Sequence, residues 1–333
     1  MRTVVLRLIE NNWQSKGLIS TVLYPLSWLY RQAIKLRQYY YQQFPALRYV
    51  APVPVIVVGN LTVGGTGKTP LVLWLTAQLQ ARGLRPAIIL RGYGGNSKHW
   101  PRLVTRRSTT DLVGDEAILL SQRTHVPVAV GPNRKKDIER LLAKTDCNII
   151  IADDGLQHLA LKASVEIGVV DGRRRFGNGR CLPAGPLREP VTRWSKLNFR
   201  VCNGGSAQGD EWSMTLQPEG ILRVASNAPS LNWQQLEGMT VHAVAGIGHP
   251  QHFFSLLSEH GVIIYPHIFK DHHKYISEDI IFNDDIPVLM TEKDAVKCRS
   301  FAIDQLHYLR VAATLDECLA DRIVAQINTF PAL

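Results

Sequence analysis

A glycine-rich segment at residues 58–70 has the residue types and spacing needed to bind a phosphate chain. It reads Val-Gly-Asn-Leu-Thr-Val-Gly-Gly-Thr-Gly-Lys-Thr-Pro, and it lies between an apolar run and an amphipathic run. This strand–loop–helix order is typical of a P-loop, whose backbone N–H groups and helix N-terminus surround phosphate oxygens. Lys68 would contact the β- and γ-phosphates of ATP, and the Thr69 hydroxyl would bind Mg²⁺. The predicted cofactor-binding residues are Thr62, Val63, Gly64, Gly65, Thr66, Gly67, Lys68 and Thr69.

The loop departs from the strict P-loop pattern at one position. The pattern has glycine six residues before the lysine, and this chain has Thr62 there, with Gly64 and Gly65 supplying the flexibility instead. The alternative is an ordinary glycine turn, which leaves the adjoining Lys-Thr pair unexplained.

Two pairs of adjacent acids could serve the metal and the transferred proton. Asp153 and Asp154 end an apolar run at 148–152, and burying such acids without a cation is costly. An alternative role for Asp154 is to cap a helix. The second pair, Asp115 and Glu116, opens a predicted helix at 117–123, where acids are also favoured by the helix dipole. The residues predicted to lie at the metal are Thr69, Glu116, Asp153, Asp154 and Gln157.

Three basic loops and one histidine loop could complete the site. Arginines occur in the segments 91–95, 171–179 and 183–190, and their guanidinium groups suit phosphate recognition. A run such as Arg173–Arg175 can equally be a solvated face. His272, between Asp271 and His273, could tune a base or lie in a solvated loop. The predicted substrate-binding residues are Arg91, Tyr93, His158, Arg173, Arg188 and Glu189.

The charge of the chain is concentrated near its N-terminus. The net charge over 333 residues is +10, yet residues 1–110 contain 15 Lys and Arg residues and one acid, Glu10. This asymmetry favours an anionic partner, although a basic enzyme without such a partner is an alternative. The five cysteines show neither a CxxC pair nor metal-ligand spacing, which favours reduced thiols in a cytoplasm and argues against zinc.

The segment 13–44 is rich in aromatic and aliphatic residues interleaved with Lys and Arg. Its longest uncharged run, Gly17–Tyr30, has fourteen residues and contains Pro25. This is too short to span a bilayer, which takes about 20 apolar residues. An amphipathic helix at an anionic membrane surface fits better, with a kink or a break at Pro25. The alternative is a helix that packs its apolar face on the protein core.

The elements that position these residues follow an α/β pattern. Continuous apolar runs alternate with helical stretches from residue 53 to about 200, which predicts a P-loop NTPase-type, doubly wound parallel sheet with helices on both faces. The runs lie at 54–58, 87–90, 126–130, 148–152 and 166–170. A second, smaller α/β set follows. The predicted domains are an N-terminal amphipathic helix at 1–50, a nucleotide-binding domain at 51–200, a hairpin or linker at 201–235 and a C-terminal domain at 236–333.

Taken together, the chain resembles the tetraacyldisaccharide 4′-kinase family of lipid A biosynthesis. The resemblance rests on motifs that occur in order over nearly the whole chain, at 58–70, 91–94, 113–116, 153–158, 176–179, 182–189, 246–248, 271–272 and 291–297. Leu156 stands where the family often has Phe, a small apolar change. In this family Thr62 is a normal variant of the loop.

The resemblance implies a kinase that uses ATP and Mg²⁺ to phosphorylate the 4′-hydroxyl of an acylated glucosamine disaccharide 1-phosphate, giving lipid IVA. It also implies an N-terminal helix that docks peripherally on the cytoplasmic face of the inner membrane. Asp115 matches the family's proposed base and His272 its partner, while Lys68 neutralises phosphate charge. Glu116, Gln157 and Thr69 would lie near the metal.

Two other functional classes remain as alternatives from the sequence. A membrane-associated P-loop switch or partitioning ATPase has a similar loop, but such loops usually carry an extra lysine near their start, where this chain has Thr62 and Val63. A nucleic-acid binder would explain the positive charge, but the chain lacks a recognition-helix motif and an RNA-binding aromatic platform. We therefore expect no nucleic-acid partner.

Overall fold

The computed structural model describes residues 13–301 and 303–329. The parts of the predicted N- and C-terminal domains at 1–12 and 330–333 lie outside the described residues. The first half of the fold contains strands β1 (Val55–Gly59), β2 (Pro86–Leu90), β3 (Arg102–Leu103), β4 (Val128–Val130), β5 (Ile149–Asp153), β6 (Val165–Asp171) and β7 (Phe199–Asn203). The remaining strands are β8 (Trp212–Arg223), β9 (Thr240–Ala245), β10 (Ile263–Ile268), β11 (Val288–Thr291) and β12 (Leu306–Thr314).

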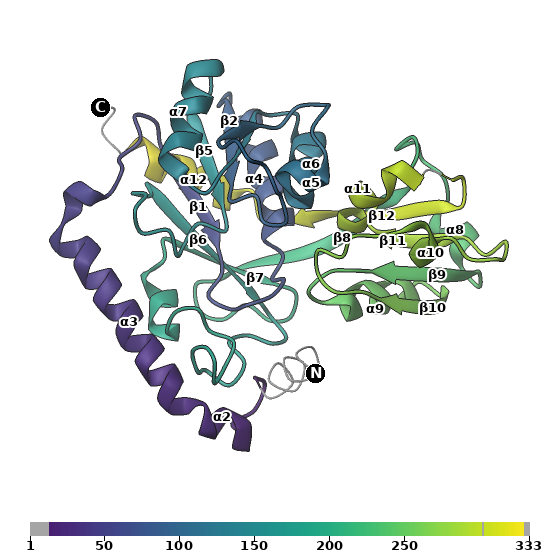
Figure 1. The fold of residues 1–333 in the computed structure, drawn as a ribbon, viewed down its shortest axis with the longest axis horizontal. Coiled ribbons are helices and arrows are strands. Elements are labelled where there is room, and N and C mark those ends of the chain that lie inside the picture. The colour runs from purple at the N-terminus through teal and green to yellow at the C-terminus, as the bar shows by residue number, and fades with distance from the viewer. Residues whose placement is uncertain (1–12, 302, 330–333) are drawn as a thin grey trace.

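These strands form one mixed sheet that runs through both halves of the molecule (Figure 1). Within the described residues its order is β10-β9-β11-β12-β8-β7-β6-β1-β5-β2-β4-β3. The first half is parallel from β7 to β4, and the short edge strand β3 is antiparallel to β4. The α/β fold class predicted from the sequence is therefore confirmed.

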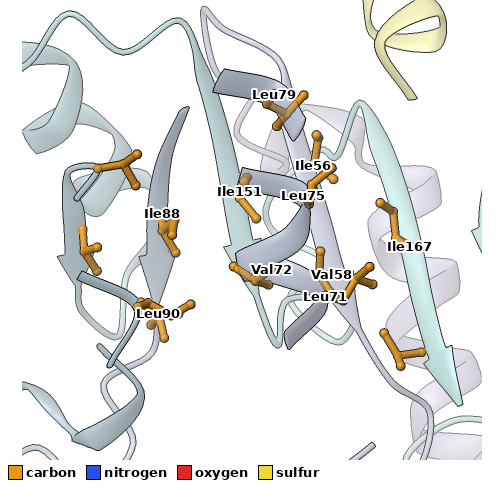
Figure 2. Close-up of a cluster of buried hydrophobic side chains, with 14 of the residues drawn as sticks. Ile56, Val58, Leu71, Val72, Leu75, Leu79, Ile88, Leu90, Ile151 and Ile167 are labelled. Carbon is orange, nitrogen blue, oxygen red and sulfur yellow. The ribbon is translucent and has the colours of Figure 1, made fainter. Parts of the chain in front are cut away.

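The helices of the first half cover both faces of its sheet. They are α4 (Lys68–Ala81), α5 (Thr110–Val113), α6 (Asp115–Thr124) and α7 (Arg134–Lys144), with a 3-10 turn η2 at Val191–Lys196. Every residue of β1, β2 and β5 is buried, as expected for parallel strands covered on two sides. Figure 2 shows one of the two cores, where α4 lays Leu71, Val72, Leu75 and Leu79 against Ile56, Val58, Ile88, Leu90, Ile151 and Ile167 of the strands.

The second half repeats the pattern on a smaller scale. Its helices are α8 (Trp233–Leu236), α9 (Pro250–Glu259), α10 (Ser277–Ile280) and α11 (Glu292–Cys298), followed by a 3-10 turn η3 at Arg299–Phe301 and by α12 (Cys318–Asn328). Strands β10, β9, β11 and β12 are parallel. The final helix, α12, returns to the first half, where Leu319 and Ile323 share a core with Leu75 and Leu79 of α4.

The segment 201–235 connects the halves in a way that the sequence did not indicate. Within this predicted hairpin or linker, β7 and the 12-residue strand β8 pair in parallel, and β8 continues into the second half as the antiparallel partner of β12. After β8 the chain turns back, so that Pro229 pairs with Leu222. Figure 1 shows β8 and β12 together bridging the two halves. The alternation of exposed and buried residues along β8 marks a strand that lies outside a fully covered sheet.

Two helices precede the sheet, α2 (Leu18–Val22) and α3 (Tyr24–Gln43), and a 3-10 turn η1 follows at Pro45–Leu47. The break predicted at Pro25 is confirmed, since α2 ends at Val22 and Pro25 lies in the first turn of α3, where its missing N–H costs no helical hydrogen bond. In Figure 1, α3 runs along one side of the first half. No helix in the described ranges is both long and apolar enough to cross a membrane.

The two N-terminal helices turn small polar side chains inward and large apolar ones outward. Ser20 and Ser27 are buried, and their hydroxyls donate to the carbonyl oxygens of Ala184 and Cys181 at 2.6 and 2.8 Å. The exposed apolar residues are Leu18, Ile19, Val22, Tyr24, Leu26, Trp28, Leu29, Leu36, Tyr39 and Tyr40. The alternative of a helix that packs its apolar face on the core is therefore wrong.

Candidate functional site

A cleft of about 1960 Å³ brings both halves and α3 to one place. From the first half it is lined by the phosphate loop, the ends of β2 and β5, the start of α6 and the loop before η2. The second half contributes residues near 247–256, 268–272 and 291–293. The predicted site residues that line it are Val63, Gly64, Gly65, Thr66, Gly67, Lys68, Thr69, Arg91, Tyr93, Glu116, Asp153, Asp154, Gln157, His158, Arg173, Arg188, Glu189 and His272.

The phosphate loop has the backbone that its glycines allow. Gly64 and Gly67 have φ values of 99° and 92°, in the left-handed region, and α4 starts at Lys68. A Cβ atom at Gly67 would also collide with the side chain of Asn203. Thr62 has no positive φ, and it is buried against Leu187 on a neighbouring strand-like segment. The position therefore has no need of glycine in this chain.

Two asparagines that the sequence analysis overlooked fix the shape of this loop. Asn60 donates its side-chain amide to the Gly64 carbonyl oxygen at 3.2 Å and accepts from Lys68 Nζ at 3.2 Å. Asn203, at the end of β7, donates to the Thr66 carbonyl oxygen at 3.1 Å. Asparagines in loops carry no periodic signal, so only the folded topology reveals that these two converge on the phosphate loop.

The paired acids at the end of β5 have different surroundings. Asp154 has a φ of 51° and lies 3.4 Å from Lys68 Nζ and 3.0 Å from Arg188. Burial would raise the pKa of Asp154, but the charges of Lys68 and Arg188 hold it below its ordinary value. No helix begins at Asp154 in the structure, so its predicted alternative as a helix cap is wrong.

Asp153 is buried and has one carboxylate oxygen, Oδ1, without a hydrogen-bond partner. Burial and the nearby charge of Glu116 raise the pKa of Asp153 to about 7. An unpartnered buried carboxylate oxygen is the kind of group that a divalent cation satisfies. Asp153 and Thr69 both line the cleft, so the donor set fits Mg²⁺ held between carboxylate, hydroxyl and phosphate oxygens.

The other predicted metal residues have protein partners. Glu116 Oε1 lies 3.0 Å from Lys293 Nζ, and the Gln157 side-chain amide donates to Glu189 at 2.9 Å and to the Asn60 carbonyl oxygen at 3.2 Å. Among the described residues, no three His, Cys, Asp or Glu side chains form a metal-binding group on their own. Which of these residues contacts a cation therefore stays a prediction.

The two halves meet at Asp115 and His272. Both Asp115 carboxylate oxygens lie 3.0 Å from His272 Nδ1, although the residues are 157 positions apart. Asp115 is 5% exposed at the start of α6, and His272 lines the cleft with a φ of 59°. The Tyr93 ring packs 4.8 Å from the His272 ring. The solvated-loop alternative for His272 is therefore wrong.

The pair of Asp115 and His272 predicts a pH dependence of stability. Burial would raise the pKa of Asp115, but the His272 hydrogen bond and Lys293 hold it below its ordinary value. Burial works to lower the pKa of His272, and the bond to Asp115 outweighs it and raises that pKa. The Asp115 contribution is lost as pH falls through its lowered pKa, and the His272 contribution is lost as pH rises through its raised pKa.

We therefore expect the strongest coupling between about pH 4 and 6.5, the ordinary pKa values of the two groups. A double-mutant cycle of Asp115→Asn and His272→Gln, measured by denaturant unfolding at about pH 5.5, should give about 1.5–3 kcal/mol. At about pH 9 the coupling should be smaller, because the imidazole loses its proton as the pH rises through its raised pKa. Equal coupling at both pH values would contradict the ion pair.

The three consecutive arginines at 173–175 have different partners. Arg174 donates to the Gly65 carbonyl oxygen at 2.9 Å and pairs with Asp171 at 3.0 Å. Arg175 turns away and pairs with Glu211 at 2.7 Å, whereas Arg173 lines the cleft. A uniformly solvated run is therefore wrong for Arg174 and Arg175, because each has a carboxylate partner.

Two basic side chains near Asp153 and Glu116, those of Arg134 and Lys293, could not be identified as site residues from a local sequence pattern. Arg134, buried in the first turn of α7, donates to the Asp153 carbonyl oxygen at 3.0 Å. Lys293, in α11, joins Glu116 to Asp271 at 3.0 and 3.2 Å, and these acids raise its pKa against the effect of burial. Lys293 falls inside the motif at 291–297, whose family resemblance was the only available pointer to it.

Comparisons with known proteins agree with this geometry. A family described as tetraacyldisaccharide-1-P 4′-kinase matches residues 19–328. A tetraacyldisaccharide 4′-kinase of Nitrosococcus oceani is 46% identical over 323 residues, covering 96% of this chain and 94% of the relative. One of Hahella chejuensis is 45% identical over 326 residues, covering 96% of each chain.

A solved structure extends the likeness to three dimensions. It is described as the "apo" form of LpxK from Aquifex aeolicus in complex with ATP, and it aligns with a TM-score of 0.77 at 27% identity, covering 93% of this chain and all of that one. The match over nearly the full length includes the phosphate loop and both members of the Asp115–His272 pair. The chain is therefore a kinase and belongs to the tetraacyldisaccharide-1-P 4′-kinase family.

Proposed function

We propose that the cleft transfers the γ-phosphate of ATP to the 4′-hydroxyl of a tetraacyldisaccharide 1-phosphate, the precursor that becomes lipid IVA. The observation that carries the proposal is the Asp115–His272 pair, built from both halves at a cleft that also contains the phosphate loop. A nucleotide switch needs no proton acceptor for a second substrate, whereas a kinase acting on a sugar hydroxyl does. The family and the ATP-containing relative support the same reaction.

The phosphate loop would hold the donor. Its backbone N–H groups and the N-terminus of α4 would bind the phosphates, and Lys68, now paired with Asp154, would move its charge to the β- and γ-oxygens. Asp153 and Thr69, with Glu116, Asp154 and Gln157 nearby, would hold Mg²⁺. When bound, Mg²⁺ supplies positive charge that stabilises the negative charge developing on the transferred group.

The Asp115–His272 pair would accept the proton of the attacking hydroxyl. The carboxylate of Asp115 is ionised and bound to Nδ1 of His272, and the imidazole is the member that lines the cleft. Asp115 lies between Gly114 and Glu116, which line the cleft, so the two residues would act as one unit at its wall, with Asp115 as the base and His272 fixing its position and charge. Because the pair spans both halves, it forms only while they are in contact.

The rim of the cleft suits an anionic acceptor. Arg91, Arg173 and Arg188 would contact it through guanidinium groups, which can bind a sugar phosphate in a bidentate manner, and Tyr93 and His158 would add hydrogen-bonding groups. Burial and three nearby arginines lower the pKa of His158 to about 4, so it would be neutral and serve as a hydrogen-bonding group. We propose no nucleic-acid partner.

The outward face of α2 and α3 would place the cleft at an anionic membrane surface. Exposed apolar side chains beside Arg31, Lys35 and Arg37 form the kind of surface that lies in a headgroup layer. The acceptor carries acyl chains, so a peripheral position on the cytoplasmic face of the inner membrane would deliver its sugar to the cleft. The helix α3 also lines the cleft through Tyr30, Ile34, Arg37 and Gln38.

This placement gives a direct prediction for vesicle binding. Replacing Leu29 and Leu36, 57% and 69% exposed, with Glu should reduce co-sedimentation with anionic vesicles at least tenfold, because two apolar contacts are lost and two like charges are added. The control is Gln42→Glu, a charge change at an exposed position of the same helix with no apolar contact to lose. Undiminished binding of the Leu29→Glu/Leu36→Glu variant would contradict membrane docking through this face.

The proposed reaction is tested by incubating the purified protein with ATP, Mg²⁺ and the tetraacyldisaccharide 1-phosphate, followed by mass spectrometry of the lipid. The expected product is heavier by one phosphate group at the 4′-position, and chelation of Mg²⁺ should prevent its formation. ATP hydrolysis without any phosphorylated lipid would favour the switch ATPase instead.

A further inference from the structure

A chain of hydrogen bonds joins the outer helix α3 to the phosphate loop. Gln38 of α3 donates its side-chain amide to Glu189 Oε2 at 2.8 Å, and Gln157 donates to Glu189 Oε1 at 2.9 Å. The same Gln157 amide donates to the Asn60 carbonyl oxygen at 3.2 Å, and Asn60 Oδ1 accepts from Lys68 Nζ at 3.2 Å. Four residues, Gln38, Glu189, Gln157 and Asn60, thus connect a surface helix to the lysine that would bind ATP.

Glu189 is the centre of this chain. Its side chain is 3% exposed, and burial raises its pKa even though two amides and, at 3.8 Å, the Arg193 guanidinium stabilise the charge. Both carboxylate oxygens already accept hydrogen bonds from protein amides. A carboxylate so engaged is poorly placed to bind a substrate hydroxyl, whereas it is well placed to hold two elements in register.

The attachment of α3 makes such a link consequential. The helix meets the loop before η2 through single polar contacts, including the Tyr30 hydroxyl that donates to the Arg188 carbonyl oxygen at 3.1 Å. Arg188 pairs with Asp154 at 3.0 Å, and Glu189 accepts from Gln157 at 2.9 Å, and all four residues line the cleft. A displacement of α3 is therefore transmitted to Asp154 and Asn60, which both contact Lys68, without passing through the sheet.

We infer that Glu189 is a positioning residue that couples the placement of α3 to the geometry of the phosphate loop. When α3 settles on a membrane, Gln38 would carry the adjustment to Glu189, and Gln157 and Asn60 would carry it to Lys68. Nucleotide binding and membrane docking would then be linked, so the protein would bind ATP most tightly while it is docked on the membrane that contains the lipid acceptor. The inference rests on the proposed function, but its first test needs no phosphoryl transfer.

The first test measures ATP affinity with and without vesicles of phosphatidylethanolamine and phosphatidylglycerol that contain no acceptor. Because coupling between two binding events is reciprocal, vesicles should tighten ATP binding by about fivefold in the wild type. Gln38→Ala should remove this change, while the matched control Gln42→Ala, an exposed residue on the same helix, should keep it. Equal vesicle effects in Gln38→Ala and the wild type, or no effect in the wild type, would overturn the inference.

An exchange of donor and acceptor gives the second test. Gln38→Glu places two carboxylates together and should abolish the vesicle effect on ATP affinity. The double variant Gln38→Glu/Glu189→Gln should restore it, because Gln at 189 can donate to Glu at 38 and still accept from Gln157. A double variant as impaired as Gln38→Glu would show that the link does not operate.

Activity separates this inference from the proposed function. If the wild type forms no phosphorylated lipid, the proposed function fails, and the vesicle effect on ATP affinity still decides the coupling. If the wild type is active, Gln38→Ala should slow lipid phosphorylation about tenfold with unchanged vesicle binding, since small misplacements near reacting groups are costly. If the rate of Gln38→Ala falls only in proportion to its vesicle binding, Gln38 contributes to docking alone, and the proposed coupling is overturned.

Discussion

Replacing Asp115 with Asn is expected to lower kcat by about 10²–10⁴, the contribution of a positioned proton acceptor. The amide keeps the size of the side chain and removes the charge that binds His272 Nδ1 at 3.0 Å. Affinity for ATP should change little, because Asp115 is buried at the start of α6 and makes no hydrogen bond to the phosphate loop. Steady-state kinetics of lipid phosphorylation and equilibrium ATP binding, measured side by side, separate the two effects.

His272→Gln serves as the companion variant in the same assays. If the two residues act as one unit, it should lose activity on a similar scale, and the double variant should be scarcely worse than either single one. Multiplicative losses in the double variant would show separate roles. A parallel loss of ATP affinity in both single variants would contradict the assignment of this pair to proton transfer.

Replacing Lys68 with Ala is expected to lower kcat/KM for ATP by about 10³ or more. The loss of a group aimed at developing negative charge typically costs about 10²–10³ in kcat, and weaker ATP binding adds to it. Asp154 and Asn60 both contact Lys68, so its removal also takes one of two cationic partners from Asp154, which keeps its pair with Arg188. Initial rates over a range of ATP concentrations give the measurement.

Lys68→Arg is the matched control because it keeps the charge. It should recover part of the ATP affinity but little of kcat, since a planar guanidinium cannot occupy the same position as an ammonium in a tight loop. A Lys68→Ala variant with near-normal kcat/KM would show that the phosphate loop takes no part in the reaction.

The central sheet could be predicted because its signals are local. The runs at 54–58, 87–90 and 148–152 became β1, β2 and β5 with boundaries shifted by a residue or so, since a strand buried on both faces must be apolar throughout. The phosphate loop was equally visible, because glycines at positive φ and a helix starting at Lys68 are required by one short segment.

The contacts across the cleft depend on topology instead. Asp115 and His272 were each candidates from the sequence, but only the family resemblance paired them, because no local pattern relates residues 157 positions apart. Arg134 and Asn203 are ordinary polar residues whose importance comes from what the strand ends bring beside them. The segment that contains the long bridging strand β8 was interpreted as a hairpin or linker, because its glycines and polar alternation resemble a turn region.

The N-terminal helices illustrate a partial success. The sequence predicted an amphipathic segment interrupted at Pro25, and the break lies there. It did not reveal that serines would face the protein and leucines the outside, because amphipathic periodicity alone does not say which face meets the core. Nor did it reveal Gln38 as a contact of the active cleft, since a single glutamine on a helix usually faces solvent.

The most direct measurement of the central claim is the transfer of labelled phosphate from [γ-³²P]ATP into a chloroform-soluble product. With Mg²⁺ and the acylated disaccharide 1-phosphate, the wild-type protein should move the label into the lipid, and Lys68→Ala and Asp115→Asn should leave nearly all of it in ATP. Label released only as inorganic phosphate, or lipid labelled equally by all three proteins, would contradict the account.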